Sequence, residues 1–156
     1  MLSVIKNLIG LNAILAGKIQ ADRLYGEADA FKAAGDFKSA LPLMKQASDV
    51  GSKLAPVHVA MMLLKGQGTP PSWTDAVKYL ELAIARGNAN VHISLGMVHG
   101  IGGYGLKRDQ RLAEYHLTKS IEVDNDPAGE QMLTMLKKRQ GVFGGKENPR
   151  PKIPWK

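Results

Sequence analysis

Histidine is the residue of this chain best suited to chemistry, because its imidazole binds metals and changes charge near neutral pH. His58 and His92 are 34 residues apart, and His92 and His99 are seven apart, which would place the latter two on one face of a helix. A zinc site needs three or four converging ligands, and none of these histidines has a His or Glu at a helical spacing of three or four residues. The pattern favours histidines that pack or line a groove, and it predicts neither a metal site nor a cofactor.

Other catalytic arrangements are also missing from the sequence. It contains no Gly-x-Ser-x-Gly nucleophile turn and no cysteine. The glycines of 100–105 have nearly the spacing of a phosphate-binding loop, but they follow a predicted helix and lack the Lys-Ser or Lys-Thr of that motif. Asp124 and Asp126 lie in a predicted turn, where Asx turns explain them. The sequence therefore predicts that the protein is not an enzyme and has no catalytic residue.

The elements that would position these residues repeat along the chain. In the segment 75–87, small and apolar side chains fall on one face of a predicted helix, which ends at Gly87. The same pattern stands 36 residues earlier and 37 residues later. The three sets are Ala76, Tyr79, Leu80 and Ala83; Ala40, Leu43, Met44 and Ala47; and Ala113, His116, Leu117 and Ser120. A period in this range is typical of helical repeats, and it predicts an all-α solenoid of about three helix pairs.

The remainder of the chain is divided according to these repeats. The predicted parts are a capping helix at 1–20, repeats at 21–51, 52–87 and 88–124, a half repeat at 125–140, and a basic, proline-containing tail at 141–156. The first part carries a wide apolar helical face, and we expect it to cover the exposed end of the stack. The half repeat would cover the other end. Because the tail has three prolines and no periodicity, we expect it to be extended.

The third repeat resembles the Sel1-like repeat, a relative of the tetratricopeptide repeat. The likeness lies in a Leu-Gly pair, a glycine-rich loop and an Asp-x-x-x-Ala helix start, which are Leu95, Gly96, Gly102, Gly105, Asp109 and Ala113. His99 stands where the family usually has Tyr, and in the second repeat Met62 replaces the paired glycine. The resemblance implies a right-handed superhelix of stacked helix pairs whose first helices line a concave face. It also implies a protein that binds other proteins.

We therefore expect a non-enzymatic adaptor or scaffold that binds a partner protein or peptide, with no small-molecule substrate. The residues expected to line the concave face are His58, Met62, Lys65, His92, Gly96 and His99. Trp73 and Tyr104, in loops at one edge, would add aromatic anchors of the kind that dominate binding energy. In the tail, Arg150, Lys152 and Trp155 would contact an acidic surface.

Two alternative functions stay open. Some bacterial relatives are immunity proteins that neutralise a secreted toxin. Nucleic-acid binding is suggested by the net charge of +7, but residues 1–136 carry 14 Lys and Arg against 13 Asp and Glu, whereas 137–156 carry seven against one. Because the basic charge belongs to the tail, nucleic acid is the less favoured partner.

The same composition bears on location. No stretch reaches the roughly 20 apolar residues of a membrane-spanning helix, so integral insertion is not expected and a cytoplasmic protein is. A signal peptide or a membrane-surface helix at residues 1–20 is the alternative.

Overall fold

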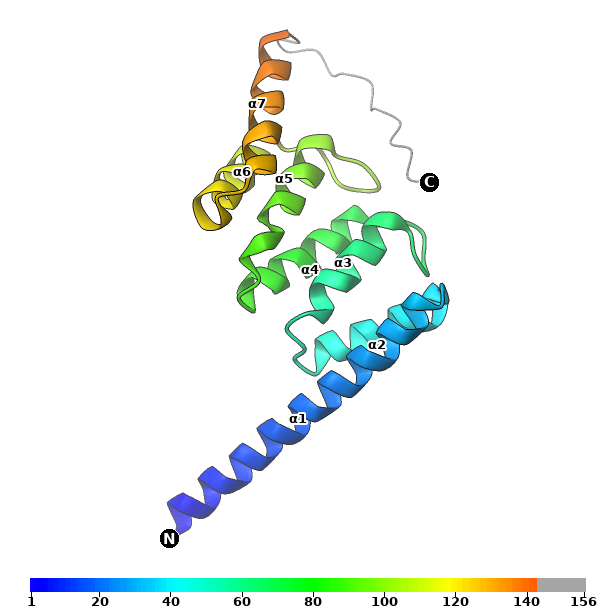
Figure 1. Cartoon of the computed structure of the whole chain (residues 1–156), viewed down its shortest axis with the longest axis vertical. Helices are drawn as coiled ribbons and strands as arrows, with labels where there is room; N and C mark the ends of the chain where they lie inside the picture. Colours follow the sequence, from blue (N-terminus) through cyan, green and yellow to red (C-terminus); the bar gives the residue numbers. More distant parts are fainter. Residues whose placement is uncertain (143–156) are drawn as a thin grey trace.

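The structure is a computed structural model that describes residues 1–142, and across these residues the chain is helical with no strand. Tail residues Arg150, Lys152 and Trp155 lie outside the described residues. The expected all-α class is confirmed. The elements, shown in Figure 1, are α1 (Leu2–Ala33), α2 (Phe37–Asp49), α3 (Ala55–Lys65), α4 (Trp73–Ala85), the short 3₁₀ helix η1 (Ala89–Val91), α5 (His92–Ile101), α6 (Gln110–Asp124) and α7 (Pro127–Val142).

The helices pack mainly against their neighbours in the chain. α1 packs on α2, α3 on α4, and α5 on α6, whereas α7 lies against α6 and α5. In Figure 1 the turn within each of the three pairs lies along one edge of the molecule, and the connections between pairs lie along the other. We call the first of these the loop edge; it comprises residues 34–36, 66–72 and 102–109.

The second helix of each pair begins with the same capping chemistry. The side chains of Asp36, Ser72 and Asp109 each accept a hydrogen bond from the backbone N–H three residues later. These N-caps satisfy a donor that a helix cannot pair internally, typically contributing about 1 kcal/mol each. Their spacings of 36 and 37 residues equal the period in the sequence.

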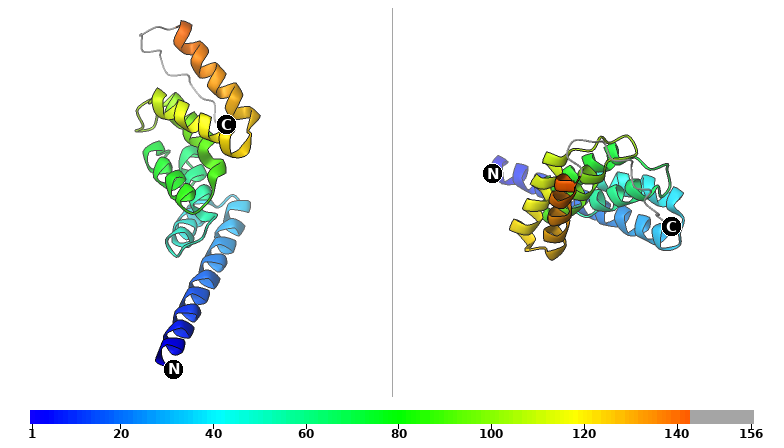
Figure 2. Two further views of the ribbon diagram at one scale, coloured as in Figure 1. Left: turned by 90° about the vertical axis from the view of Figure 1, so that its left-hand side faces the viewer. Right: turned by 90° about the horizontal axis from the view of Figure 1, so that it is seen from above.

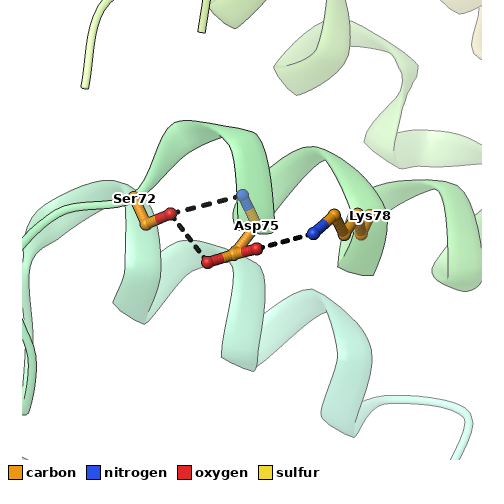
Figure 3. Close-up of polar contacts among 3 residues, drawn as sticks. All are labelled: Ser72, Asp75 and Lys78. Carbon is orange, nitrogen blue, oxygen red and sulfur yellow. Dashed lines mark hydrogen bonds and ion pairs between the residues drawn. The ribbon is translucent and has the colours of Figure 1, made fainter. Parts of the chain in front are cut away.

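Figure 3 shows the cap of α4, which is a reciprocal arrangement. The Ser72 hydroxyl accepts from the Asp75 N–H at 3.4 Å and donates to the Asp75 carboxylate at 2.9 Å. Lys78 donates to the other carboxylate oxygen at 2.9 Å. The hydrogen bond from Lys78, followed by that from Ser72, lowers the pKa of Asp75. Ser72 is therefore the N-cap of α4.

The helix ends are closed by a second repeated motif. The N–H groups of Asp36, Ser52 and Asn88 each donate, at 2.9 Å, to the carbonyl five residues earlier. In every case the preceding residue is a glycine with positive φ, namely Gly35, Gly51 or Gly87. This is the Schellman closure, in which glycine takes the left-handed conformation without steric cost. The predicted end of a helix at Gly87 is confirmed.

The core is continuous from the second half of α1 to α5. Its largest fully buried side chains include Trp73, Met44, Met62, Leu80 and Leu95. A separate, smaller cluster formed by Ala113, Leu117 and Leu136 joins α6 to α7.

Residues 1–20 differ from the expectation. They are not a separate capping helix but the first half of α1, and they project away from the pairs (Figures 1 and 2). Eight large apolar side chains between Val4 and Ile19 are 50–72% exposed. The helix is unbroken over 2–33 and continues through Gly10, Gly17 and Gly26 instead of folding back at one of them. No helix in the described part of the chain is both long and apolar enough to cross a bilayer.

Candidate functional site

His58 is half-buried between α1 and α3 and is held by two side chains of α1. The Lys32 ammonium lies 3.1 Å from Nδ1, and the Tyr25 hydroxyl lies 2.9 Å from Nε2. Because an ammonium can only donate, Nδ1 accepts, and Nε2–H donates to Tyr25. Lys32 also pairs with Asp29 at 2.5 Å. Desolvation, followed by the charge of Lys32, lowers the pKa of His58. This histidine therefore joins α1 to α3 in its neutral form.

The other three histidines meet between α5 and α6. His92 Nδ1 lies 2.9 Å from His116 Nδ1, so one ring must donate and the other accept. His99 stacks on His116, with the two ring centroids 5.9 Å apart and an interplanar angle of 7°. All three side chains are less than 10% exposed. His99 Nδ1 is buried and has no hydrogen-bond partner. The cluster is thus a packed contact within the third helix pair.

Burial keeps this cluster uncharged. Desolvation is the largest cause lowering the pKa of His116 to about 4, and the neighbouring His92 and His99 lower it further. Desolvation also lowers the pKa values of His92 and His99. Across the described residues, no group of three or more His, Asp or Glu side chains is placed to hold a metal ion. At neutral pH the arrangement offers a shared hydrogen bond between imidazoles.

Met62 and Gly96 were expected to line the concave face, but the structure buries both. Met62 is 1% exposed, and Gly96 is buried. A Cβ on Gly96 would lie 2.6 Å from Leu117 Cγ, which shows that this glycine faces α6. On α5, the face assigned to a partner is therefore the face that this helix turns toward α6.

This close approach predicts a large effect at Gly96. We expect Gly96→Ala to destabilise the fold by about 1–3 kcal/mol, because the added methyl must displace Leu117. Gly26→Ala is the matched control, since Gly26 also lies inside a helix but a Cβ there meets nothing within 4 Å. That substitution should stabilise the chain by up to about 1 kcal/mol. Urea unfolding measures both, and equal effects would contradict the contact.

Trp73 is 1% exposed and serves as an internal anchor rather than a binding residue. Its indole N–H donates to the Leu64 carbonyl at 3.2 Å, satisfying an acceptor at the end of α3. Its backbone N–H donates to the Tyr104 carbonyl at 3.1 Å, and the two rings are 5.5 Å apart. Trp73 thus fastens the loop of the third pair to the second pair.

The loop edge contains the exposed part of the predicted site. Tyr104 is 50% exposed and has a positive φ of 45°. Farther along the same edge, an open depression of about 610 Å³ is lined by the α1–α2 turn at 35–38 and by Gly66, Gly68, Thr69 and Pro70. A Cβ on Gly68 would collide with the Phe37 carbonyl, so the two turns are in close contact beneath the depression.

The predicted concave-face set is therefore mostly wrong as a binding surface. Met62, Trp73, His92, Gly96 and His99 are buried by helix pairing, and His58 is half-buried in its own network. Only Lys65 and Tyr104 of the eight residues named in the described range are exposed.

Sequence reasoning missed His116 as a member of a histidine cluster. It stands on the repeated inward face of the second helix, which packs against the helix carrying His92. That spacing was the signal that could have placed these two histidines together.

Comparison with known proteins adds no relative. No model of a known protein family matches the chain, and no curated protein matches it. The likeness to Sel1-like repeats rests on the residues quoted above.

Proposed function

We propose that the chain is a Sel1-like, tetratricopeptide-related solenoid with a right-handed superhelix, and that it acts as a non-enzymatic protein-interaction module. The observation that carries the proposal is the recurrence of one module. Its N-cap returns at Asp36, Ser72 and Asp109, and its Schellman closure returns at Gly51 and Gly87. Stacks of such modules expose long continuous surfaces, which these proteins use for recognition.

The same geometry supports a binding role over a catalytic one. The four histidines, which are the residues best suited to proton transfer, are occupied in contacts between helices or stacked on one another. Burial lowers their pKa values and holds them neutral. They stabilise the pairs and are poorly placed to meet a substrate.

The surface that we assign to the partner is the loop edge. It combines the exposed ring of Tyr104 with the depression beside Lys38 and Pro70, and Lys65 lies at the end of the adjoining helix. Exposed tyrosines are among the side chains that most often act as interaction hot spots. Tyr104 rests on the buried Trp73, so the anchor is already ordered before the partner arrives.

The experiment compares two tyrosines of nearly equal exposure. Tyr104 and Tyr115 are 50% and 53% exposed, and Tyr115 lies on α6, outside the loop edge. Asn suits both positions, because it tolerates positive φ at 104 and has about the helix propensity of Tyr at 115. We expect affinity purification from the native cells to recover a partner with the wild-type chain and with Tyr115→Asn, and to lose it with Tyr104→Asn.

Two results would count against the proposal. Partner recovery that is equal for both variants would remove the loop edge from recognition. Catalytic turnover by the purified chain would remove the non-enzymatic assignment. Circular dichroism of each variant ensures that a lost partner does not reflect a lost fold.

A further inference from the structure

The projecting half of α1 carries eight of the large apolar side chains that are exposed in the described residues. The side chains concerned are Val4, Ile5, Leu8, Ile9, Leu11, Ile14, Leu15 and Ile19, each at least half exposed. Figure 1 and the left-hand view of Figure 2 show that no other described element lies alongside this half of the helix. Soluble chains rarely leave a continuous apolar stripe uncovered, so this one calls for a partner.

The spacing of the stripe identifies the partner. Ile5, Leu8, Asn12, Leu15 and Ile19 follow one another at alternating intervals of three and four residues. This is a heptad pattern with Ile5, Asn12 and Ile19 at the a positions and Leu8 and Leu15 at the d positions. Isoleucine at a with leucine at d favours a parallel two-stranded coiled coil.

Asn12 makes the pattern specific. It is the one polar residue in the a/d series between Ile5 and Ile19, and it stands at the centre of that series. In a parallel pair the two copies of Asn12 face each other and can exchange hydrogen bonds, whereas a shifted register would leave each one among apolar side chains. A single asparagine at an a position is the known device for setting register and strand number.

The direction of the stripe leaves room for a second chain. α1 packs on α2, and the buried residues of α1 are Ala21, Leu24 and Ala28. At about 100° per residue these three positions lie roughly 140–200° around the helix from Ile19. The heptad series ends at the next d position, Asp22, where contact with α2 begins. A partner helix on the stripe would therefore lie on the side away from the chain's own α2.

We propose that this stripe pairs with the same stripe of a second copy of the chain, forming a parallel two-stranded coiled coil over residues 1–19. Val4 and Leu11 at g and Ile9 at e flank the seam and widen it. Together the stripes would bury on the order of 1,000 Å², which is the size that a specific interface requires. The pairing is independent of the loop edge.

A lipid surface fits the same segment less well. Surface-binding helices carry many cations on the polar face, and residues 1–20 have only Lys6 and Lys18. Asn12 would also lie near the middle of the apolar face, where lipid offers its amide no hydrogen-bond partner.

Two adjacent residues provide the matched test. Leu15 is a d residue, whereas Ile14 is a c residue outside the seam and is the more exposed of the two, at 72% against 56%. We expect light scattering with size exclusion to give about twice the chain mass of 16.9 kDa for the wild type and for Ile14→Glu. Leu15→Glu should be monomeric, with association weakened by about 100-fold or more, because a charge would be buried in the seam. A monomeric wild type, or equal effects of the two variants, would overturn the proposal.

Two further experiments test the parallel orientation of the paired helices and the binding of this segment to lipid. The chain has no cysteine, so Ile5→Cys introduces a single thiol. In a parallel pair the two thiols meet at one a layer and should form a disulfide-linked dimer on oxidation, whereas Ile14→Cys should not. Failure of Ile5→Cys to cross-link would overturn the parallel arrangement.

Co-sedimentation with phosphatidylcholine–phosphatidylserine vesicles should leave the wild type in solution. A wild type that sediments with the vesicles would overturn the proposal and favour lipid binding instead.

Discussion

Lowering the pH from 6.5 to 4 is expected to destabilise the folded chain by up to roughly 3 kcal/mol through His116 alone. The pKa of this buried imidazole is about 4 in the fold, against about 6.5 in an unfolded chain. Between these values the unfolded chain binds a proton that the folded chain does not, so the free energy of unfolding falls as the pH falls. Below about pH 4 the loss from this group is complete.

The other three histidines act in the same direction, because their pKa values are also lowered. Opposing charges are present but smaller in effect: Asp124 raises the pKa of His92, and Asp109 and Glu81 raise that of His99. Protonating His58 would in addition break its hydrogen bond from Lys32. Urea unfolding at pH 7, 5.5 and 4.5 measures the sum.

His116→Leu is the control for this prediction. Leucine already occupies the corresponding position of the first repeat, at Leu43, so the substitution suits the packing of the second helix. We expect the variant to lose less stability than the wild type between pH 6.5 and 4.5. Parallel pH profiles for the two proteins would show that His116 does not titrate with unfolding.

Trp73→Ala is expected to be the most damaging single truncation, costing about 3–5 kcal/mol. The side chain is 1% exposed and lies in the continuous core, so its removal leaves a cavity. The Leu64 carbonyl would also lose the indole N–H that satisfies it. A loss of this size is a large part of the total stability of a typical domain.

Trp73→Phe separates the two contributions. It keeps an aromatic ring in the core but removes the hydrogen bond to Leu64, and should cost about 1–2 kcal/mol. Denaturant unfolding gives both values, and loosening of the loop 102–106 can be followed by amide exchange of Gly103 and Leu106, which bond to each other. An alanine variant as stable as the phenylalanine variant would refute the packing role.

The helices were largely predictable because their signals are local. Asp109 was expected at a helix start and Gly87 at a helix end, and the structure confirms both. Caps and left-handed glycines act within a few residues, so the sequence alone specifies them.

The site was predicted less well because periodicity shows which positions share a face but not what that face contacts. His92 and Gly96 share a face of α5 with the expected spacing, yet the face packs on α6. The prediction of a capping helix at residues 1–20 was wrong for a similar reason. Their apolar face was assigned to the stack, although an apolar face by itself does not distinguish a neighbour within the chain from one outside it.

The neighbour-to-neighbour packing of the helices has a consequence for how the chain acquires its fold. Each pair is closed by a turn of a few residues, and each next helix docks on one already formed. In the described part of the chain the helices contact mainly their neighbours in sequence, so each loop that must close is of moderate length and costs little entropy. Proteins with such local topologies fold fast, and we expect this one to reach its native state without a long search.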